Sequence, residues 1–125
     1  MEKDTINKAL NKRLLDLSNG LSTVFDNDLL IDARSPYQRV SLHPIVIEGH
    51  RDMGLYVVTL SYPGECYDST EMKMMAQKIK DHFYRGLIFI EGDEKLIIER
   101  HPESSPPYKN NKRLDMTIRI RYYCF

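Results

Sequence analysis

The sequence predicts an α+β domain in which two helices pack on a largely antiparallel β-sheet, in the order α-β-β-β-α-β-β-β. Two stretches carry apolar residues at helical spacing, while the other segments are rich in β-branched and aromatic residues and are separated by turns with glycine or proline. This arrangement is typical of helices that pack on one sheet. A chain of 125 residues has room for one core, so we expect a single domain over 1–125.

Residues 4–19 are predicted to form the first helix. Asp4 is placed to act as its N-cap, and Gly20 is placed to end it. Its apolar positions recur every three to four residues and are Ile6, Ala9, Leu10, Leu14 and Leu17. From 21 to 36 this periodicity is lost and turn-forming residues dominate. That stretch is predicted to be a loop, with Leu29–Ile31 as its one candidate for a short strand.

Three β-type runs follow the loop. They are Tyr37–His43, Pro44–Glu48 and Leu55–Tyr62, separated by Pro44 and by the polar stretch 49–54. In the third run both alternating sets of side chains are apolar, which predicts that both faces of this strand are covered. We therefore expect Leu55–Tyr62 to be the central strand of the sheet.

Residues 69–84 are predicted to form the second helix. Asp68 and Glu71 have the spacing of a capping box at its start, and Gly86 suits the left-handed conformation that ends a helix. Its apolar stripe consists of Met72, Met75, Ala76, Ile79 and Phe83. Because Met72 and Met75 belong to that stripe or border it, core packing is favoured over an adaptable methionine binding surface.

The C-terminal part is predicted to form a hairpin, a loop and a last strand. Leu87–Ile90 and Lys95–Arg100 flank a short turn that contains glycine. The stretch 101–112 has almost nothing to bury, so we expect a long exposed loop. The last strand alternates Leu114, Met116, Ile118, Ile120 and Tyr122 with Arg113, Asp115, Thr117, Arg119 and Arg121. The first set is expected in the core, and the second is expected to face solvent or a partner.

Composition bears on the partners of the protein. Lys and Arg together number 18, as do Asp and Glu, so the formal net charge is 0. Proteins that coat nucleic acid usually carry an excess of basic residues, so this balance argues against such a role. Such a chain also meets little electrostatic opposition to self-association. The N-terminus lacks a signal-peptide pattern, and no apolar run approaches the roughly 20 residues that span a bilayer, so we expect synthesis in the cytosol and no membrane partner. Cys66 and Cys124 are expected to be reduced thiols.

No motif for catalysis, metal binding or phosphate binding is present in the sequence. The four histidines are scattered, and neither glycine-rich phosphate motif occurs, so no catalytic residue, metal or cofactor is expected. Three alternatives stay open: a cysteine nucleophile, a small hydrolase built from histidines and carboxylates that the fold gathers, and a nucleic-acid-associated module. The last would use the strand face with Arg113, Arg119 and Arg121, although such charges commonly only keep a sheet face soluble.

The chain has a spaced pattern of aromatic, glycine and proline positions, which comprises Ser35–Pro44, Gly49, Gly54–Leu60, Pro63 with Gly64, and Phe83–Gly86. With this pattern the chain resembles the tail terminator-like proteins of long-tailed phages, including a phage-related domain of unknown function. The similarity runs from the first helix to the last strand. The chain departs from many relatives in Gln38, Arg39 and His43 and in having no tryptophan.

The resemblance implies a structural, non-enzymatic virion protein of a phage or prophage. Such subunits assemble into a ring, usually a hexamer, that caps the tail tube and joins it to the head connector. The expected partners are further copies of the chain, the tail tube protein and the head-tail connector protein, with no membrane and no specific nucleic acid. The expected location is the neck-proximal end of the tail, after assembly in the host cytoplasm. The isolated chain can be a monomer in this scheme.

The expected contact residues lie in two connecting segments and on the last strand. Arg51 and Asp52 belong to the 49–54 turn, and Tyr108 with Lys109 is the contact point expected in the 101–112 loop. The resemblance implies that Arg119 and Arg121 face the lumen of the ring or a neighbouring subunit, and Arg113 lies on the same predicted face. Since ordering a loop costs conformational entropy, segment 101–112 is expected to be mobile in the monomer and fixed in the assembly.

Overall fold

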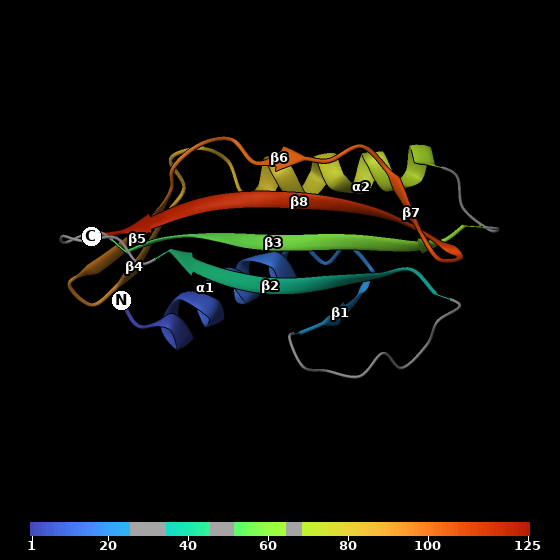
Figure 1. The fold of residues 1–125 in the computed structure, drawn as a ribbon. Coiled ribbons are helices and arrows are strands. Elements are labelled where there is room, and N and C mark those ends of the chain that lie inside the picture. The colour runs from blue at the N-terminus through green and yellow to red at the C-terminus, as the bar shows by residue number, and fades with distance from the viewer. Residues whose placement is uncertain (26–34, 46–51, 65–68) are drawn as a thin grey trace.

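The structure, a computed structural model, describes residues 1–25, 35–45, 52–64 and 69–125, which form an eight-stranded sheet and two helices (Figure 1). The strands run in the order β1-β2-β3-β8-β5-β4, and the short strands β6 and β7 also pair with β8. The elements are α1 (Lys3–Asp16), β1 (Ser22–Val24), β2 (Tyr37–Ile45), β3 (Asp52–Pro63), α2 (Ser69–His82), β4 (Ile88–Glu91), β5 (Glu94–Ile98), β6 (Glu103–Ser104), β7 (Tyr108–Asn110) and β8 (Arg113–Cys124).

The predicted α+β class is confirmed, but the sheet is mixed. All strand pairs are antiparallel except β1 with β2, which are parallel. Strand β1 lies in the stretch 21–36, which was predicted to be a loop. Gln38 is only 1% exposed, and it forms one hydrogen bond with β1 and one with Asn19, which precedes β1. Its Nε2 donates to Thr23 Oγ1 at 2.9 Å, and Asn19 Nδ2 donates to its Oε1 at 2.9 Å. The candidate strand Leu29–Ile31 lies outside the described residues.

Strand β2 continues through Pro44, so the prediction that a new strand begins there is wrong. Pro44 pairs with Gly54 of β3, and Ile45 pairs with Met53. Among the described residues, this half of β2 has a strand on one side only. Proline has no N–H to donate, so it is tolerated where a strand has a free edge. The rest of the predicted strand, residues 46–48, lies outside the described part of the chain.

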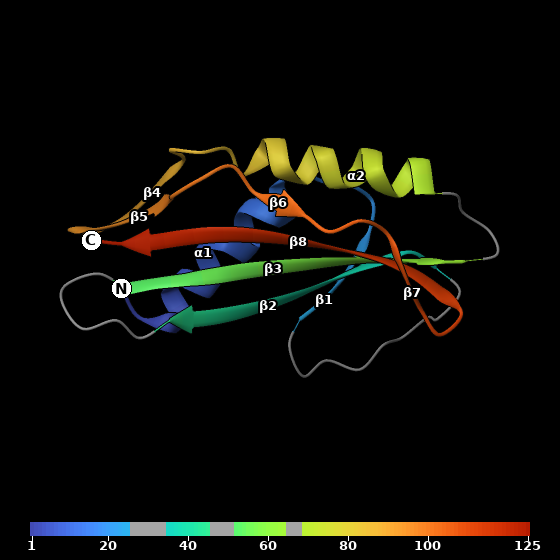
Figure 2. The ribbon, with the colours of Figure 1, turned by 45° about the horizontal axis from the view of Figure 1, so that its top comes forward.

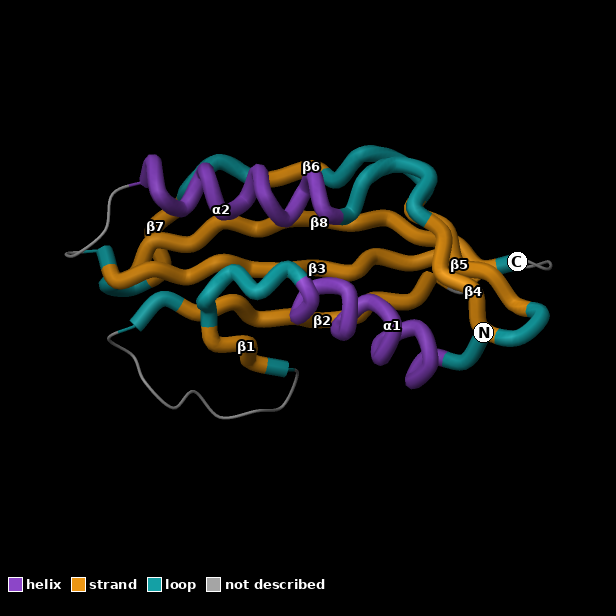
Figure 3. The backbone as a smooth tube through the Cα atoms, turned by 180° about the vertical axis from the view of Figure 1, so that it is seen from behind, coloured by secondary structure: helices purple, strands orange, loops and turns teal. Residues whose placement is uncertain are grey.

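Both helices lie on the same face of the sheet, as the view from behind shows (Figure 3). Their buried side chains, Ile6, Leu10 and Leu14 from α1 and Met72, Ala76 and Ile79 from α2, meet Tyr56, Val58, Leu60, Ile118, Ile120 and Tyr122 of the two central strands. We call the opposite side the open face; its side chains are the alternate set of β2, β3 and β8, namely Arg39, Ser41, His43, Leu55, Val57, Thr59, Thr117, Arg119 and Arg121.

Strand β3 is central, as predicted, because it lies between β2 and β8. The prediction that both of its faces are covered is wrong. Tyr56 and Val58 are fully buried beneath the helices, whereas Leu55 and Val57 on the open face are half-buried. Both helices pack on one face, so the apolar side chains of the other face keep part of their surface in contact with solvent.

The predicted helices are confirmed with shorter bounds. Glu2, and not Asp4, is the N-cap of α1, and its side chain makes no capping hydrogen bond. The helix ends at Asp16 because Ser18 already adopts a positive φ of 52°, two residues before Gly20. Helix α2 ends at His82, and Gly86 has the expected left-handed conformation, with a φ of 89°. The proposed cap Asp68 lies outside the described residues.

Three hydrogen bonds between Arg13 and His82 join the last turns of the two helices. Arg13 donates to the carbonyl oxygen of His82 from Nη2 at 2.9 Å and from Nε at 3.2 Å. His82 Nε2 lies 2.7 Å from the carbonyl oxygen of Arg13, and since a carbonyl can only accept, the imidazole donates. A basic side chain thereby satisfies a carbonyl at the end of α2, where the helix dipole favours positive charge.

Segment 101–112 is not the loose loop that its composition predicts. Strands β6 and β7 pair with β8, and Figure 2 shows both running along it. Ser105 N donates to Thr117 O at 2.8 Å, and Thr117 N donates to Ser105 Oγ at 3.0 Å. On this side of β8, strand β5 pairs with only the last three residues of the strand, Tyr122 to Cys124. Most of this edge of β8 is therefore left for segment 101–112 to cover. These bonds hold the segment to the sheet within a single subunit.

Candidate interaction surface

The open face carries two adjacent arginines from β8. Arg119 pairs with Val57 and Arg121 pairs with Leu55, so each arginine has an apolar neighbour on β3. Arg119 is exposed. The Arg121 side chain is 35% exposed, and its Nε lies 3.9 Å from Glu99 Oε2, a long ion pair. Because side chains alternate along β8, these arginines lie on the open face, whereas the buried isoleucines of the same strand lie on the face that the helices cover.

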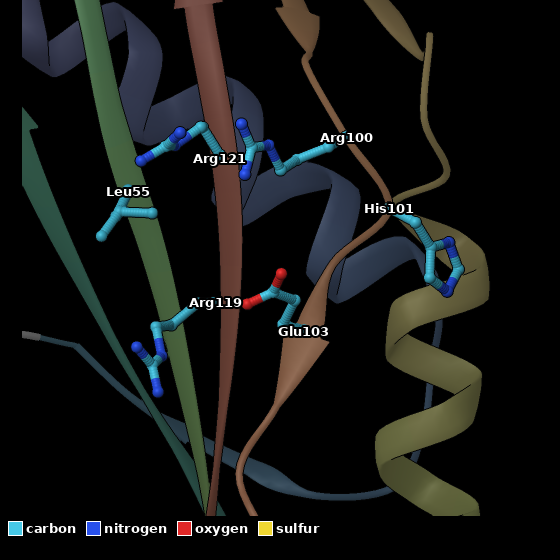
Figure 4. Close-up of a pocket in the computed structure, with 6 residues that line it drawn as sticks. All are labelled: Leu55, Arg100, His101, Glu103, Arg119 and Arg121. Carbon is cyan, nitrogen blue, oxygen red and sulfur yellow. The ribbon is translucent and has the colours of Figure 1, made fainter.

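A shallow pocket of about 120 Å³ lies beside these arginines (Figure 4). Its lining consists of Leu55, Arg100, His101, Glu103, Arg119 and Arg121, and we call it the arginine pocket. Glu103 comes from β6, in register with Arg119, and its carboxylate points toward β8, while the His101 ring turns toward α2. Arg100 and His101 lie just beyond the end of β5, after Glu99. None of these three residues was predicted as a contact, because their local pattern is that of a strand end and a loop.

Arg113 lies apart from the other two arginines, at the start of β8, and is held in an internal network. Its Nε donates to Ser61 Oγ at 2.7 Å, and its Nη2 donates to the carbonyl oxygens of Ser35 at 2.8 Å and Ser61 at 3.0 Å. The guanidinium carbon also lies 4.6 Å from the centroid of the Tyr37 ring. The structure therefore groups Arg119 with Arg121 and gives Arg113 a role in joining β8 to β3 and to the start of β2.

Replacing Arg113 by lysine is expected to lower the free energy of unfolding by about 2 kcal/mol. Lysine keeps the charge but cannot reproduce the planar fork that reaches Ser61 and Ser35 together. Urea denaturation monitored by circular dichroism measures the change. Arg119→Lys is the matched control on the same strand, and we expect it to stay within about 0.5 kcal/mol of the unsubstituted protein. Equal losses in the two variants would contradict the structural role of Arg113.

The remaining predicted contact residues lie elsewhere on the surface. Tyr108 is 42% exposed, and its hydroxyl lies 2.9 Å from Thr117 Oγ1. Lys109 is exposed and lines a separate depression near the start of β8. Arg51 lies outside the described residues, and Asp52 begins β3 opposite Cys124. The structure thus places Tyr108 and Lys109 near the opposite end of β8 from Arg121.

The polar groups of the interior serve the fold. The Tyr56 hydroxyl donates to Asn11 Oδ1 at 2.6 Å, and burial raises the pKa of this phenol above its usual value because it disfavours the phenolate. Asp115 is 4% exposed and accepts a 2.9 Å hydrogen bond from Asn110. Cys124 is buried, and Cys66 lies outside the described part of the chain.

Among residues 1–25, 35–45, 52–64 and 69–125, no group of three or more histidine, cysteine or acidic side chains is placed to hold a metal ion. Over the same described residues, neither helix has the length and apolar character that a membrane span requires. His43 lies within β2, with Nε2 2.8 Å from Ser41 Oγ, and His101 lines the arginine pocket. The main features of the described surface are therefore its charged side chains and its exposed apolar side chains.

Comparison with known proteins gives the family. A solved structure 20% identical in sequence superposes on this chain with a TM-score of 0.81, over 100% of this chain and 96% of the other. At that identity the likeness shows the fold alone. No curated protein matches the chain. A family model described as phage tail terminator protein matches residues 5–122, from the first helix to the end of the last strand. The chain therefore belongs to the phage tail terminator protein family, whose members are structural components of phage tails.

Proposed function

We propose that this protein is the subunit of a ring, a hexamer in the assembled virion, that caps the tail tube and joins it to the head connector. The observation that carries the proposal is the family match over residues 5–122. The partners are further copies of this chain, the tail tube protein and the head-tail connector protein. The ring lies at the neck-proximal end of the tail, and it assembles in the host cytoplasm.

The shape of the subunit supports assembly into a ring. A head-to-tail ring needs two different patches on each subunit, and the sheet ends in two different edge strands, β1 and β4. The β4 edge exposes Ile88 by 48% and Ile90 by 68%, and Phe125 is 54% exposed at the adjoining C-terminus. Exposed isoleucines on an edge strand favour association with another chain.

Assembly is expected to depend on concentration. We expect light scattering after size-exclusion chromatography to show monomers at low micromolar concentration and a hexamer-sized species as the concentration rises, with the same series repeated in divalent ions. Mass action requires this shift for a reversible ring. A single monomeric species at every concentration, together with no effect of the protein on the growth of tail tubes, would contradict the proposal.

The capping role has its own measurement. Tubes of the tail tube protein from the same phage are expected to stop elongating when the folded terminator is added, so their mean length in electron micrographs falls. Heat-denatured terminator is the control. Tubes that keep the same length in both samples would count against capping while leaving ring formation untouched.

A further inference from the structure

The arginine pocket contains charges that the fold itself does not use. Arg100 and Arg119 are both exposed, and within the described residues neither side chain makes a hydrogen bond or an ion pair. Arg121 has only the 3.9 Å contact with Glu99. Three guanidinium groups face two carboxylates, Glu103 in the lining and Glu99 beside Arg121, which leaves an excess of one positive charge around the pocket. Such a surface is complementary to carboxylates, which arginine binds through paired N–H donors.

The size of the pocket indicates what kind of group it accepts. Its volume of about 120 Å³ lies below the range of roughly 300–1,000 Å³ that is usual for small-molecule sites. Leu55 supplies an apolar wall between the two arginines of β8. The pocket therefore suits the ends of one or two acidic side chains presented by another protein surface.

An acidic surface of this kind exists on the same chain, at the tip of the β4–β5 hairpin. Glu91, Asp93 and Glu94 are all exposed there. Glu94 forms a 2.8 Å ion pair with the N-terminal amine, whereas Glu91 and Asp93 have no ion pair or side-chain hydrogen bond within the described residues. We call Glu91–Glu94 the acidic tip. Its excess negative charge opposes the excess positive charge of the arginine pocket.

The acidic tip cannot reach the arginine pocket of its own subunit. Strand β5 runs from the tip toward Arg100, and the eight residues from Asp93 to Arg100 span on the order of 20 Å in extended conformation. Lys95 N donates to Phe125 O at 2.9 Å, so the tip extends past the C-terminal end of β8. Figure 2 shows the hairpin beside the C-terminus, at the end of the sheet. The two surfaces can meet only between subunits.

We propose that the acidic tip of one subunit docks into the arginine pocket of the next, and that this contact repeats around the ring. The inference rests on the proposed ring and names its interface. The contact is head-to-tail because the tip and the pocket are different surfaces of one chain, which is the kind of interface that closes into a ring. Ile88 lies in register with Ile97 and Tyr123 on the open-face side of the hairpin, so docking of the tip also covers apolar surface.

Two charge-reversal variants test the contact. The tip variant carries Glu91→Lys and Asp93→Lys, and the pocket variant carries Arg100→Glu and Arg119→Glu. All four positions are exposed, so both variants are expected to keep the melting temperature of the unsubstituted protein. Each variant alone places like charges at every interface, and we expect the hexamer-sized species to be lost. Lys73→Glu with Lys78→Glu, on the exposed side of α2, makes the same charge change as the pocket variant and should leave assembly intact.

Mixing the two variants is the decisive measurement. The tip variant has a basic tip and a basic pocket, whereas the pocket variant has an acidic tip and an acidic pocket. Subunits that alternate around a ring therefore restore opposite charges at every interface. We expect an equimolar mixture to recover the hexamer-sized species, with both variants present in equal amounts by mass spectrometry. Raising the salt concentration should weaken the unsubstituted ring because the charges are exposed.

Three results overturn the inference. Variants that assemble as well as the unsubstituted protein show a ring that uses another interface, and the proposed function survives. Variants that fail alone and also fail as a mixture show that tip and pocket do not pair. A pocket variant that still assembles but loses salt-sensitive binding to duplex DNA shows that the pocket serves nucleic acid. If the unsubstituted protein never assembles and never caps tubes, the proposed function fails as well.

Discussion

Replacing Gly54 by alanine is expected to lower the free energy of unfolding by about 3 kcal/mol, because the new methyl group overpacks the sheet near the start of β3. A Cβ at this position would meet the hydroxyl of Tyr122 and lie 2.9 Å from the carbonyl oxygen of His43. Gly54 pairs with Tyr122 across β3 and β8, and the tyrosine is only 1% exposed, so it has no room to move aside. Thermal and urea denaturation measure the loss.

A matched control separates this contact from the general effect of replacing glycine. Gly92, in the hairpin turn, has a φ of 61°, and a methyl group added there would have no atom within 4 Å. Gly92→Ala is therefore expected to cost only about 1 kcal/mol, which comes from backbone strain. Combining Gly54→Ala with Tyr122→Leu should cost less than the sum of the single changes, since the smaller side chain makes room. Strict additivity would exclude the contact with Tyr122 as the cause.

Replacing Phe83 by alanine is expected to cost about 3 to 5 kcal/mol, the usual range for deletion of a buried aromatic ring. Phe83 follows the last residue of α2 and is fully buried. Its ring centroid lies 6.0 Å from that of Tyr56 and 5.7 Å from that of His82. The cavity would open where α2 meets β3 and next to the hydrogen bonds that join the two helices. For a chain of this length we expect the melting temperature to fall by roughly 10 to 20 °C.

Met74 provides the control on the same helix. Its side chain is 60% exposed, so Met74→Ala is expected to change the free energy of unfolding by less than about 0.5 kcal/mol. Differential scanning calorimetry of the two variants measures both changes. Comparable shifts in melting temperature would show that the helix contributes little through its apolar stripe, which would contradict the packing of α2 on the sheet.

The elements that the sequence predicted best are those in which one residue period persists over many residues. The apolar stripes of α1 and α2 recur at helical spacing, and their buried members Leu10, Leu14 and Ile79 are fully or almost fully enclosed. The strict alternation of β8 identified Ile118 and Ile120 as core residues. These patterns are local, so they report which face of an element is buried without reference to its neighbours.

The errors occurred where a strand or side chain packed against the segment decides its conformation. Pro44 indicated a break in the strand, but the free edge of β2 tolerates it. The polar stretch 101–112 indicated a loop, but the uncovered edge of β8 pairs with it. Likewise Arg113 belongs to the same alternating set as Arg119, yet only Arg113 meets Ser61 and Tyr37. Composition does not distinguish these cases, because Arg113 depends on residues far along the chain, whereas Pro44 and segment 101–112 depend on which strand edges the fold leaves free.

The sequence by itself determined the class of fold, the two helices, the core face of β8 and, through its resemblance, the family. Only the tertiary structure decided that both helices cover one face, that β1 joins parallel to β2, and that Arg100, Glu103 and Arg119 meet in one pocket. The physical reason is that burial depends on a periodicity carried along each element, whereas strand pairing and the grouping of charges depend on which elements become neighbours when the chain folds.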